Sequence, residues 1–177
     1  GPVAREIDRF MKANKGFLRY DDMAAFHARV EEPVVTSYRG FEIYKAGFWS
    51  QGPVMLQALN LLEGFDLKKM GAGSVEYLHT MVESLKLAYA DRDSFYGDPA
   101  FAKVPAETLL SKAYAAERAK LISANTASGE AQPGSPDGLR ALHPAAFLKQ
   151  TTPPASASRD TTCVNVVDRS GMMFSAT

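Results

Sequence analysis

Hydrophobic residues recur at helical spacing over most of the chain and alternate with polar residues near its end. The first pattern predicts helices and the second predicts strands. In residues 2–16, apolar side chains recur at helical spacing before a glycine stop, which predicts an amphipathic helix. Residues 21–30 predict a shorter helix. Strand-type residues on both sides of Arg39 and Gly40 predict a β-hairpin over residues 36–47.

The middle of the chain predicts three further helices. Residues 52–62 are almost wholly apolar, so this helix is expected to be buried on most sides. Ser74 caps a long helix, which is expected to pack through one apolar stripe. The stripe consists of Val75, Leu78, Val82, Leu85 and Tyr89. Residues 106–122 predict one more helix.

The pattern changes again after these helices. Periodicity is lost over residues 125–159, where Ala, Ser, Gly, Pro and Thr predominate, and this composition predicts a long exposed loop or a mobile linker. Alternation returns at residues 161–168, which predict a strand, and a turn at Gly171 leads into a second one. Because that second strand is short and an unpaired apolar strand leaves an aggregation-prone edge, we expect the chain to be a fragment of a longer protein.

Composition and charge narrow the classes of function. The chain has 177 residues, 46% hydrophobic and 23% charged, which is ordinary for one globular domain. Basic and acidic residues number 20 each, so no excess of positive charge points to nucleic acid or to an anionic membrane. The longest apolar stretch, about a dozen residues, is too short to span a bilayer. Cys163 is the only cysteine and the histidines lack metal-ligand spacing, so neither an internal disulfide nor a metal site is predicted.

Two stretches carry a resemblance to a known family. They are EYLHTMVESLKLAYADRDSFYGDPAF, residues 76–101, and DTTCVNVVDRSGMMFSAT, residues 160–177. Both resemble the corresponding parts of gamma-glutamyltranspeptidases, in the superfamily of N-terminal nucleophile hydrolases. The opening helix, the YRG hairpin and the buried helix ending in LNLLEGFDL also lie where that family has similar segments. The resemblance therefore covers most of the chain except the linker.

The resemblance implies a fold class and a division of the chain. The fold would be α+β, part of a four-layer αββα sandwich, with the chain mostly helical and ending in a β-hairpin. Residues 1–124 would form the C-terminal part of a large subunit, and residues 125–160 the linker to a processing site. Residues 161–177 would begin the small, catalytic subunit.

The resemblance also implies a role for Thr161, which without it would be a typical strand start. The family's precursors cut themselves before a threonine, here between Asp160 and Thr161, and that threonine becomes the terminal nucleophile. A hydroxyl needs a base to remove its proton, and a free terminal α-amine, with a reference pKa of about 7.7–8.0, suits that role. The implied reaction passes a γ-glutamyl group from glutathione or a related γ-glutamyl amide to water or an acceptor amine. It implies no cofactor and no metal.

Departures from the family pattern leave the substrate open. Cys163 stands where many members carry histidine, and the runs GMMFSAT and FWSQGP also differ from the usual sequences. One alternative is a related amide acylase, either cephalosporin-acylase-like or polyglutamate-cleaving. Another is an unprocessed, non-catalytic scaffold of the same fold. Cleavage between Asp160 and Thr161 would distinguish the scaffold from the enzymes.

The resemblance places the other catalytic parts outside this chain. The arginine that grips the substrate carboxylate would lie before Gly1 and the oxyanion hole after Thr177, so the chain alone is expected to be inactive. The expected partners are a small γ-glutamyl substrate and the remainder of its own precursor, without nucleic acid and without a membrane segment in this chain. The compartment stays open: the family favours the periplasm or secretion, and the cytoplasm is the alternative.

Other polar and aromatic residues are expected to be structural. Charges on the long helix are expected to form exposed ion pairs and caps, a common arrangement at helical spacing. These charges are Glu83, Lys86, Asp91 and Arg92. His79 is expected to be a hydrogen-bonded packing residue. Trp49 and Gln51 are expected either to line the approach to the site or, for the tryptophan, to anchor the core. Cys163 is expected to be half-buried in its strand.

Overall fold

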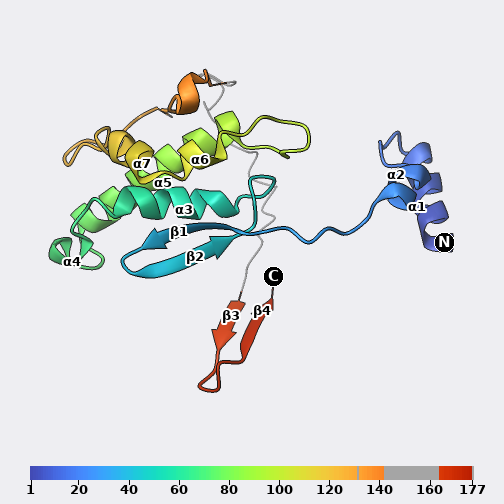
Figure 1. The fold of residues 1–177 in the computed structure, drawn as a ribbon, viewed down its shortest axis with the longest axis horizontal. Helices are drawn as coiled ribbons and strands as arrows, with labels where there is room; N and C mark the ends of the chain where they lie inside the picture. The colour runs from blue at the N-terminus through green and yellow to red at the C-terminus, as the bar shows by residue number, and fades with distance from the viewer. Residues whose placement is uncertain (131, 142–163, 177) are drawn as a thin grey trace.

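The computed structural model describes the chain except for residues 131, 142–163 and 177 (Figure 1). Within the described residues, no helix is both long and apolar enough to cross a membrane. The helices are α1 (Pro2–Ala13), α2 (Tyr20–Ala25), α3 (Gly52–Leu62), α4 (Leu67–Met70), α5 (Val75–Phe95), α6 (Ala106–Leu109), α7 (Lys112–Ala119) and the short 3₁₀ turn η1 (Pro136–Gly138). The strands are β1 (Val34–Tyr38), β2 (Phe41–Lys45), β3 (Val164–Val167) and β4 (Met173–Ala176).

Helices α1 and α2 pack on each other at the start of the chain. The carboxylate of Asp8 joins them by accepting a hydrogen bond from Tyr20 N at 3.2 Å, and it also pairs with Lys12 within α1 at 2.7 Å. The helix expected over residues 2–16 is confirmed, whereas the one expected over residues 21–30 is shorter. Neither helix contains a buried residue.

Strands β1 and β2 form the predicted antiparallel hairpin, with Tyr38 paired to Phe41. The two turn residues, Arg39 and Gly40, have φ values of 50° and 90°. A two-residue turn with both φ values positive matches the right-handed twist of the strands. The hairpin lies against α3, and the buried Thr36 donates a hydrogen bond to Asn60 at 2.6 Å.

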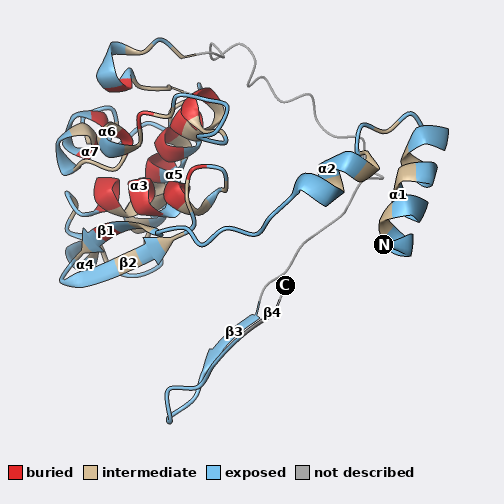
Figure 2. Ribbon diagram, turned by 45° about the vertical axis from the view of Figure 1, so that its right-hand side comes forward, coloured by how far each residue is buried: buried red, intermediate tan, exposed pale blue. Residues whose placement is uncertain are grey.

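The core lies between α3, α5 and α7. Figure 2 shows the buried residues concentrated on these central elements, whereas α1 and residues 164–174 of the β3–β4 hairpin are exposed or intermediate. Helix α3 is buried along most of its length, as its apolar sequence predicts. It approaches α5 at small residues, since Ser84 and Ala88 are 0% exposed and Ala88 packs against Val54 and Ala58. Small side chains on a helix face let two helices approach closely.

The face through which α5 packs differs from the expected one. The apolar stripe is exposed, from 37% at Leu85 to 86% at Val75. The buried face carries mainly small and polar residues, together with the apolar Leu87 and Phe95: Thr80, Glu83, Ser84, Leu87, Ala88, Ala90, Asp91, Ser94 and Phe95. The expectation that the stripe packs within the chain is therefore wrong. The polar face is the buried one because its small residues pack against α3 and its carboxylates accept hydrogen bonds from α7 and from the segment that follows α7.

The helix expected over residues 106–122 is divided in two. Helix α6 ends at Leu109, and Ser111 then caps α7 by accepting a hydrogen bond from Tyr114 N at 3.1 Å. An N-cap residue has extended backbone and so interrupts a continuous helix. The break places Leu109, 1% exposed, against Phe48 and Phe95 in the core.

Candidate functional site

The predicted nucleophile and its processing bond lie outside the described residues. Neither Thr161 nor Asp160 is placed by the structure, and the same holds for Cys163. Strand β3 begins at Val164, three residues after Thr161. The surroundings that can be described are the hairpin after this position and the segment before it, which ends at Ala141.

The hairpin after Thr161 has a well-defined turn. Strands β3 and β4 pair antiparallel from Val164 opposite Ala176 to Val167 opposite Met173, which confirms the predicted hairpin within the described residues. At the turn, Asp168 Oδ1 accepts hydrogen bonds from Ser170 N at 2.8 Å and the Ser170 hydroxyl at 2.6 Å. The hydrogen bond from this hydroxyl, with those from backbone N–H groups, holds the pKa of the Asp168 carboxyl below its ordinary value.

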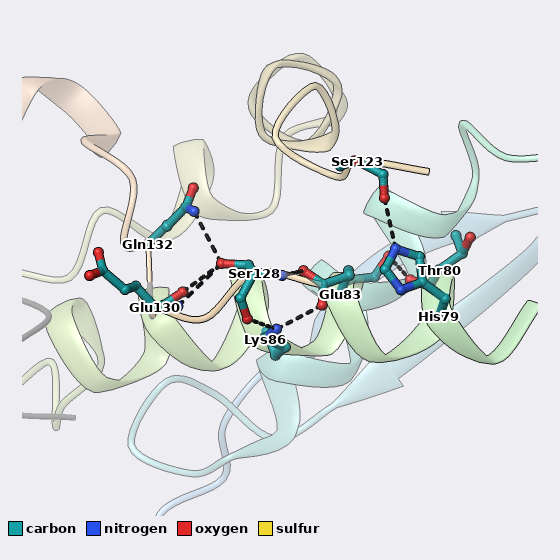
Figure 3. A network of polar contacts seen from close by, with 9 residues as sticks. His79, Thr80, Glu83, Lys86, Ser123, Ser128, Glu130 and Gln132 are labelled. Carbon is teal, nitrogen blue, oxygen red and sulfur yellow. Dashed lines mark hydrogen bonds and ion pairs between the residues drawn. The ribbon is translucent and has the colours of Figure 1, made fainter. Parts of the chain in front are cut away.

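The segment before the predicted processing site is held by Glu83 and Lys86 of α5. Glu83 accepts a hydrogen bond from Ser128 N at 3.1 Å and pairs with the Lys86 ammonium at 2.7 Å. Lys86 in turn donates to the Ser128 carbonyl oxygen. Figure 3 shows these side chains converging on Ser128, whose hydroxyl also accepts a hydrogen bond from Gln132. Both polar groups of the Ser128 backbone are therefore satisfied by α5.

A second acid on the same helix holds the segment six residues further on. Asp91 is 2% exposed, and its Oδ1 accepts a hydrogen bond from Gly134 N at 2.7 Å. Its other oxygen accepts from the Tyr114 hydroxyl at 3.0 Å and from Gln57 at 3.2 Å. The Arg118 guanidinium lies 3.5 Å from Asp91. These five residues share one buried polar cluster that joins α3, α5 and α7 to the segment.

For both Asp91 and Glu83, burial acts to raise the carboxyl pKa and pairing acts to lower it. Burial raises the pKa of the Asp91 carboxyl, although the Arg118 charge and the Gly134 N–H oppose this. Burial also acts to raise the pKa of Glu83, but the Lys86 ammonium and the Ser128 N–H outweigh it, so this pKa is lowered. Burial beside Asp91 raises the pKa of the Tyr114 hydroxyl, which therefore stays a neutral donor.

These contacts bear on two expectations. The charges Glu83 and Asp91 were expected to be exposed, but both are buried. The ion pair between Glu83 and Lys86 is confirmed. Residues 125–159 were expected to be exposed, and their described part is exposed or half-buried except at Pro136, which is buried, while Leu139 packs against the core.

The signal for these acids was present in the sequence. Glu83, Leu87 and Asp91 follow one another at four-residue intervals and so share one helix face, beside the small residues Ser84 and Ala88. A helix face of small residues flanked by acids can be buried in place of an apolar stripe. Hydrophobic periodicity alone does not identify such a face.

The remaining candidates lie on the surface. Trp49 is 56% exposed and donates a hydrogen bond to Glu31 at 2.8 Å, so it does not anchor the core. Gln51 accepts a hydrogen bond from Arg92 at 2.7 Å. His79 is hydrogen-bonded to the Ser123 carbonyl at 2.7 Å, as expected of a packing residue. Among the described residues, no three His, Cys, Asp or Glu side chains are grouped so that they could hold a metal ion.

The lowered pKa of Glu83 predicts a pH-dependent contribution to stability. A carboxyl whose folded pKa lies below its unfolded value, about 4.3, stabilises the fold above that value and loses the contribution as the pH falls through the folded pKa. We therefore expect the wild type to be more stable than Glu83→Gln in urea unfolding at about pH 7, with the difference shrinking below about pH 4. A difference that is constant across this range would contradict a charged, paired Glu83.

Comparison with known proteins extends the resemblance to the whole chain. The sequence model described as Gamma-glutamyltranspeptidase matches residues 1–177. The glutathione hydrolase proenzyme of Escherichia coli (strain K12) is 42% identical over 137 residues, which cover 76% of this chain and 24% of that protein. The Acylase ACY 1 proenzyme of Pseudomonas sp. (strain SE83) is 37% identical over 178 residues, covering 100% of this chain and 28% of that protein.

A solved structure agrees with the sequence matches. The crystal structure of Helicobacter pylori gamma-glutamyltranspeptidase superposes with a TM-score of 0.70 at 35% identity, over 81% of this chain and 41% of that one. The fold is therefore α+β, a piece of an N-terminal nucleophile hydrolase sandwich. The chain spans only about a quarter of the length of the two curated relatives. Over the whole of its length, the chain belongs to the gamma-glutamyltranspeptidase family.

Proposed function

We propose that the full-length parent of this chain is a γ-glutamyl hydrolase or transferase that activates itself by cutting between Asp160 and Thr161. The observation that carries the proposal is the family match over residues 1–177, which extends through both residues of the proposed bond. The position of Thr161 just before β3 supports it, since a strand can hold a terminal residue at a fixed place. Both curated relatives are proenzymes by name.

The proposed activation uses the Thr161 hydroxyl as its own nucleophile. The hydroxyl oxygen attacks the carbonyl carbon of Asp160, the peptide C–N bond breaks, and the acyl group moves to oxygen as an ester. The nitrogen of Thr161 takes up the proton and becomes a free α-amine. Water then hydrolyses the ester, leaving a carboxylate on Asp160 and a free hydroxyl on Thr161.

The same hydroxyl would then carry out turnover. The α-amine of Thr161, absent before cleavage, removes the hydroxyl proton as the oxygen attacks the γ-glutamyl carbonyl. The leaving amine departs with a proton, and a γ-glutamyl ester remains on Thr161. Water or an acceptor amine opens that ester and restores the hydroxyl. One side chain and one backbone amine thus supply the nucleophile and the base.

A chromogenic γ-glutamyl anilide tests this function directly in the full-length parent. We expect the processed parent to release the aniline and to release it faster when an acceptor amine such as glycylglycine is added, if it is a transferase. A hydrolase would release it at the same rate with or without the acceptor. No release by a parent that has been cut at Thr161 would contradict the γ-glutamyl assignment.

An amide acylase of different specificity is the second candidate, favoured by the match of the Pseudomonas acylase along 100% of this chain. A glutaryl anilide separates the two, because it differs from the γ-glutamyl anilide only in lacking the α-amino group. An enzyme that binds the α-ammonium group of a γ-glutamyl substrate should have a much higher kcat/KM for the γ-glutamyl anilide than for the glutaryl anilide. Preference for the glutaryl compound would assign the parent to the acylases.

We also propose that the remainder of the precursor covers the exposed stripe of α5. The stripe runs from Val75 to Tyr89 along a single helix, and Leu78 and Val82 are both 53% exposed. A contiguous apolar surface of this kind is uncommon on an isolated soluble protein and is typical of an interface. Because the curated relatives are about four times as long as the matched part, the parent has ample chain to cover it.

A further inference from the structure

Arg118 is a buried arginine with one unpaired donor. Its Nη2 donates hydrogen bonds to Asp91 Oδ1 at 3.5 Å and to the carbonyl oxygen of Gln132. Its Nε is also buried, but it has no hydrogen-bond partner among the described residues. Nearly all buried donors in folded proteins have an acceptor, supplied by the protein or by a bound water molecule. The Nε–H of Arg118 therefore needs an acceptor that its described neighbours do not supply.

A small cavity lies beside Arg118 and is formed by residues of α3, α5, α6 and α7. It leaves about 10 Å³ for the centre of a water molecule, which suits one water and is too little for two. A cavity holds a water when its walls offer about two to four polar partners, and wholly apolar cavities stay dry. The lining combines three apolar side chains, Leu61, Leu109 and Ala115, with four polar ones, Gln57, Asp91, Tyr114 and Arg118.

The charges around the cavity favour a neutral occupant. The carboxylate of Asp91 disfavours an anion there, and the guanidinium of Arg118 disfavours a cation. The occupant must also be a single small molecule that accepts a hydrogen bond from Nε–H. Water meets both conditions, and its two hydrogens then need acceptors of their own.

Two of the lining groups can accept those hydrogens. Asp91 already accepts four hydrogen bonds, which is about the number of its lone-pair sites. The Tyr114 hydroxyl donates its hydrogen to Asp91, so its oxygen keeps lone pairs that can accept. Gln57 Oε1 accepts one hydrogen bond, from the Tyr96 hydroxyl, and has a second lone pair. Tyr114 and Gln57 are therefore the acceptors that complete the site.

We propose that this cavity is a binding site for one structural water molecule, which accepts the Arg118 Nε–H and donates to the Tyr114 hydroxyl oxygen and Gln57 Oε1. The water would join α7 to α3 and hold the guanidinium in place beside Asp91. The site is independent of the proposed self-cleavage, so we expect it in both the uncut precursor and the processed enzyme.

A high-resolution crystal structure of the full-length parent, with a second crystal soaked in bromide, tests the site directly. We expect one density peak that refines as water, about 2.7–3.2 Å from Arg118 Nε and within hydrogen-bond reach of Tyr114 and Gln57. We expect no anomalous signal from bromide at this position. The absence of the peak, a protein group bound to Nε, or a bromide peak would each overturn the proposal.

Two valine variants of the parent test the same site in solution. Ala115 is 4% exposed and lines the cavity, whereas the next residue of α7, Ala116, is exposed. Ala115→Val should displace the water and leave Nε–H unpaired, so its Tm should lie several degrees below that of Ala116→Val. Both variants carry the same cost of a β-branched residue in a helix. A Tm for Ala115→Val at or above that of the control would overturn the proposal.

Repeating both valine substitutions in Arg118→Lys separates loss of the water from overpacking by the added methyl groups. Lysine keeps a positive charge near Asp91 but has no donor at the position of Nε. In this background the Tm difference between the two valine variants should largely disappear. An undiminished difference would attribute the loss to overpacking and overturn the proposal. If Ala115→Val or Arg118→Lys does not fold, the density in the wild-type crystals decides.

Discussion

The Thr161→Ala variant of the full-length parent should accumulate as one uncut chain without γ-glutamyl turnover. Under the proposed mechanism both reactions lose their nucleophile, because activation and catalysis would use the same hydroxyl oxygen. In a serine protease, removal of the nucleophile lowers kcat on the order of 10⁶-fold, and a comparable loss is expected here. Denaturing gel electrophoresis and the γ-glutamyl anilide assay measure the two losses on the same sample.

Two companion substitutions separate chemistry from structure at this site. Thr161→Ser keeps the hydroxyl but loses the methyl group that restricts χ1, so the oxygen is less well held. It should still cut and turn over, with a loss of up to about 10²-fold, the cost of misplacing a reacting atom by about 1 Å. Cys163→Ser should mature normally. If Thr161→Ser behaves like Thr161→Ala while Cys163→Ser blocks processing, Thr161 is not the nucleophile.

Leu56→Ala should destabilise the chain by about 2–5 kcal/mol, the range for removing a fully buried leucine. Leu56 is 0% exposed on α3, the helix that contacts α5, α7 and β1, so truncating its side chain leaves a cavity in the core. Urea unfolding of the 177-residue chain followed by circular dichroism measures the loss as a lower midpoint with an unchanged slope.

The neighbouring residue provides the control for this prediction. Met55 is 45% exposed on the same helix, and Met55→Ala removes a similar volume from the surface. Its effect should stay within about 0.5 kcal/mol, as for most surface substitutions. Equal losses for Leu56→Ala and Met55→Ala would show that α3 is not packed as described.

Local signals predicted the elements of this fold well. The start of α5 at Ser74 and the turn at Arg39 and Gly40 depend on a few neighbouring residues, so their sequence signatures are sufficient. The same applies to α3, whose almost wholly apolar sequence allows only a buried helix. The break before α7 also has a local cause, the Ser111 cap, which the periodicity of residues 106–122 concealed.

The face of α5 could not be predicted in the same way. Periodicity identifies which side of a helix is apolar, but it does not say which partner covers that side. Here Leu78 and Val82 are on the apolar side, whereas the partners present in the chain meet Glu83 and Asp91 on the other. Those partners, Ser128 and Gly134, are more than forty residues away in sequence, so the burial of the two acids is a tertiary effect.

The candidate site was identified through resemblance rather than through local pattern. Two threonines before a valine-rich run are typical of a strand start, and β3 begins shortly after them. What distinguishes Thr161 is the family match over residues 1–177. The four-residue spacing of Glu83, Leu87 and Asp91 places both acids on one helix face, but their hydrogen bonds to Ser128 and Gly134 became evident only from the structure.

Self-cleavage at Thr161 is tested most directly by the intact mass of the full-length parent after expression, with the N-terminal sequence of its smaller product. We expect two polypeptides whose masses sum to the precursor plus one water, the larger ending at Asp160 and the smaller beginning at Thr161. A smaller product that begins at another residue, or a single uncut chain with full γ-glutamyl turnover, would contradict it.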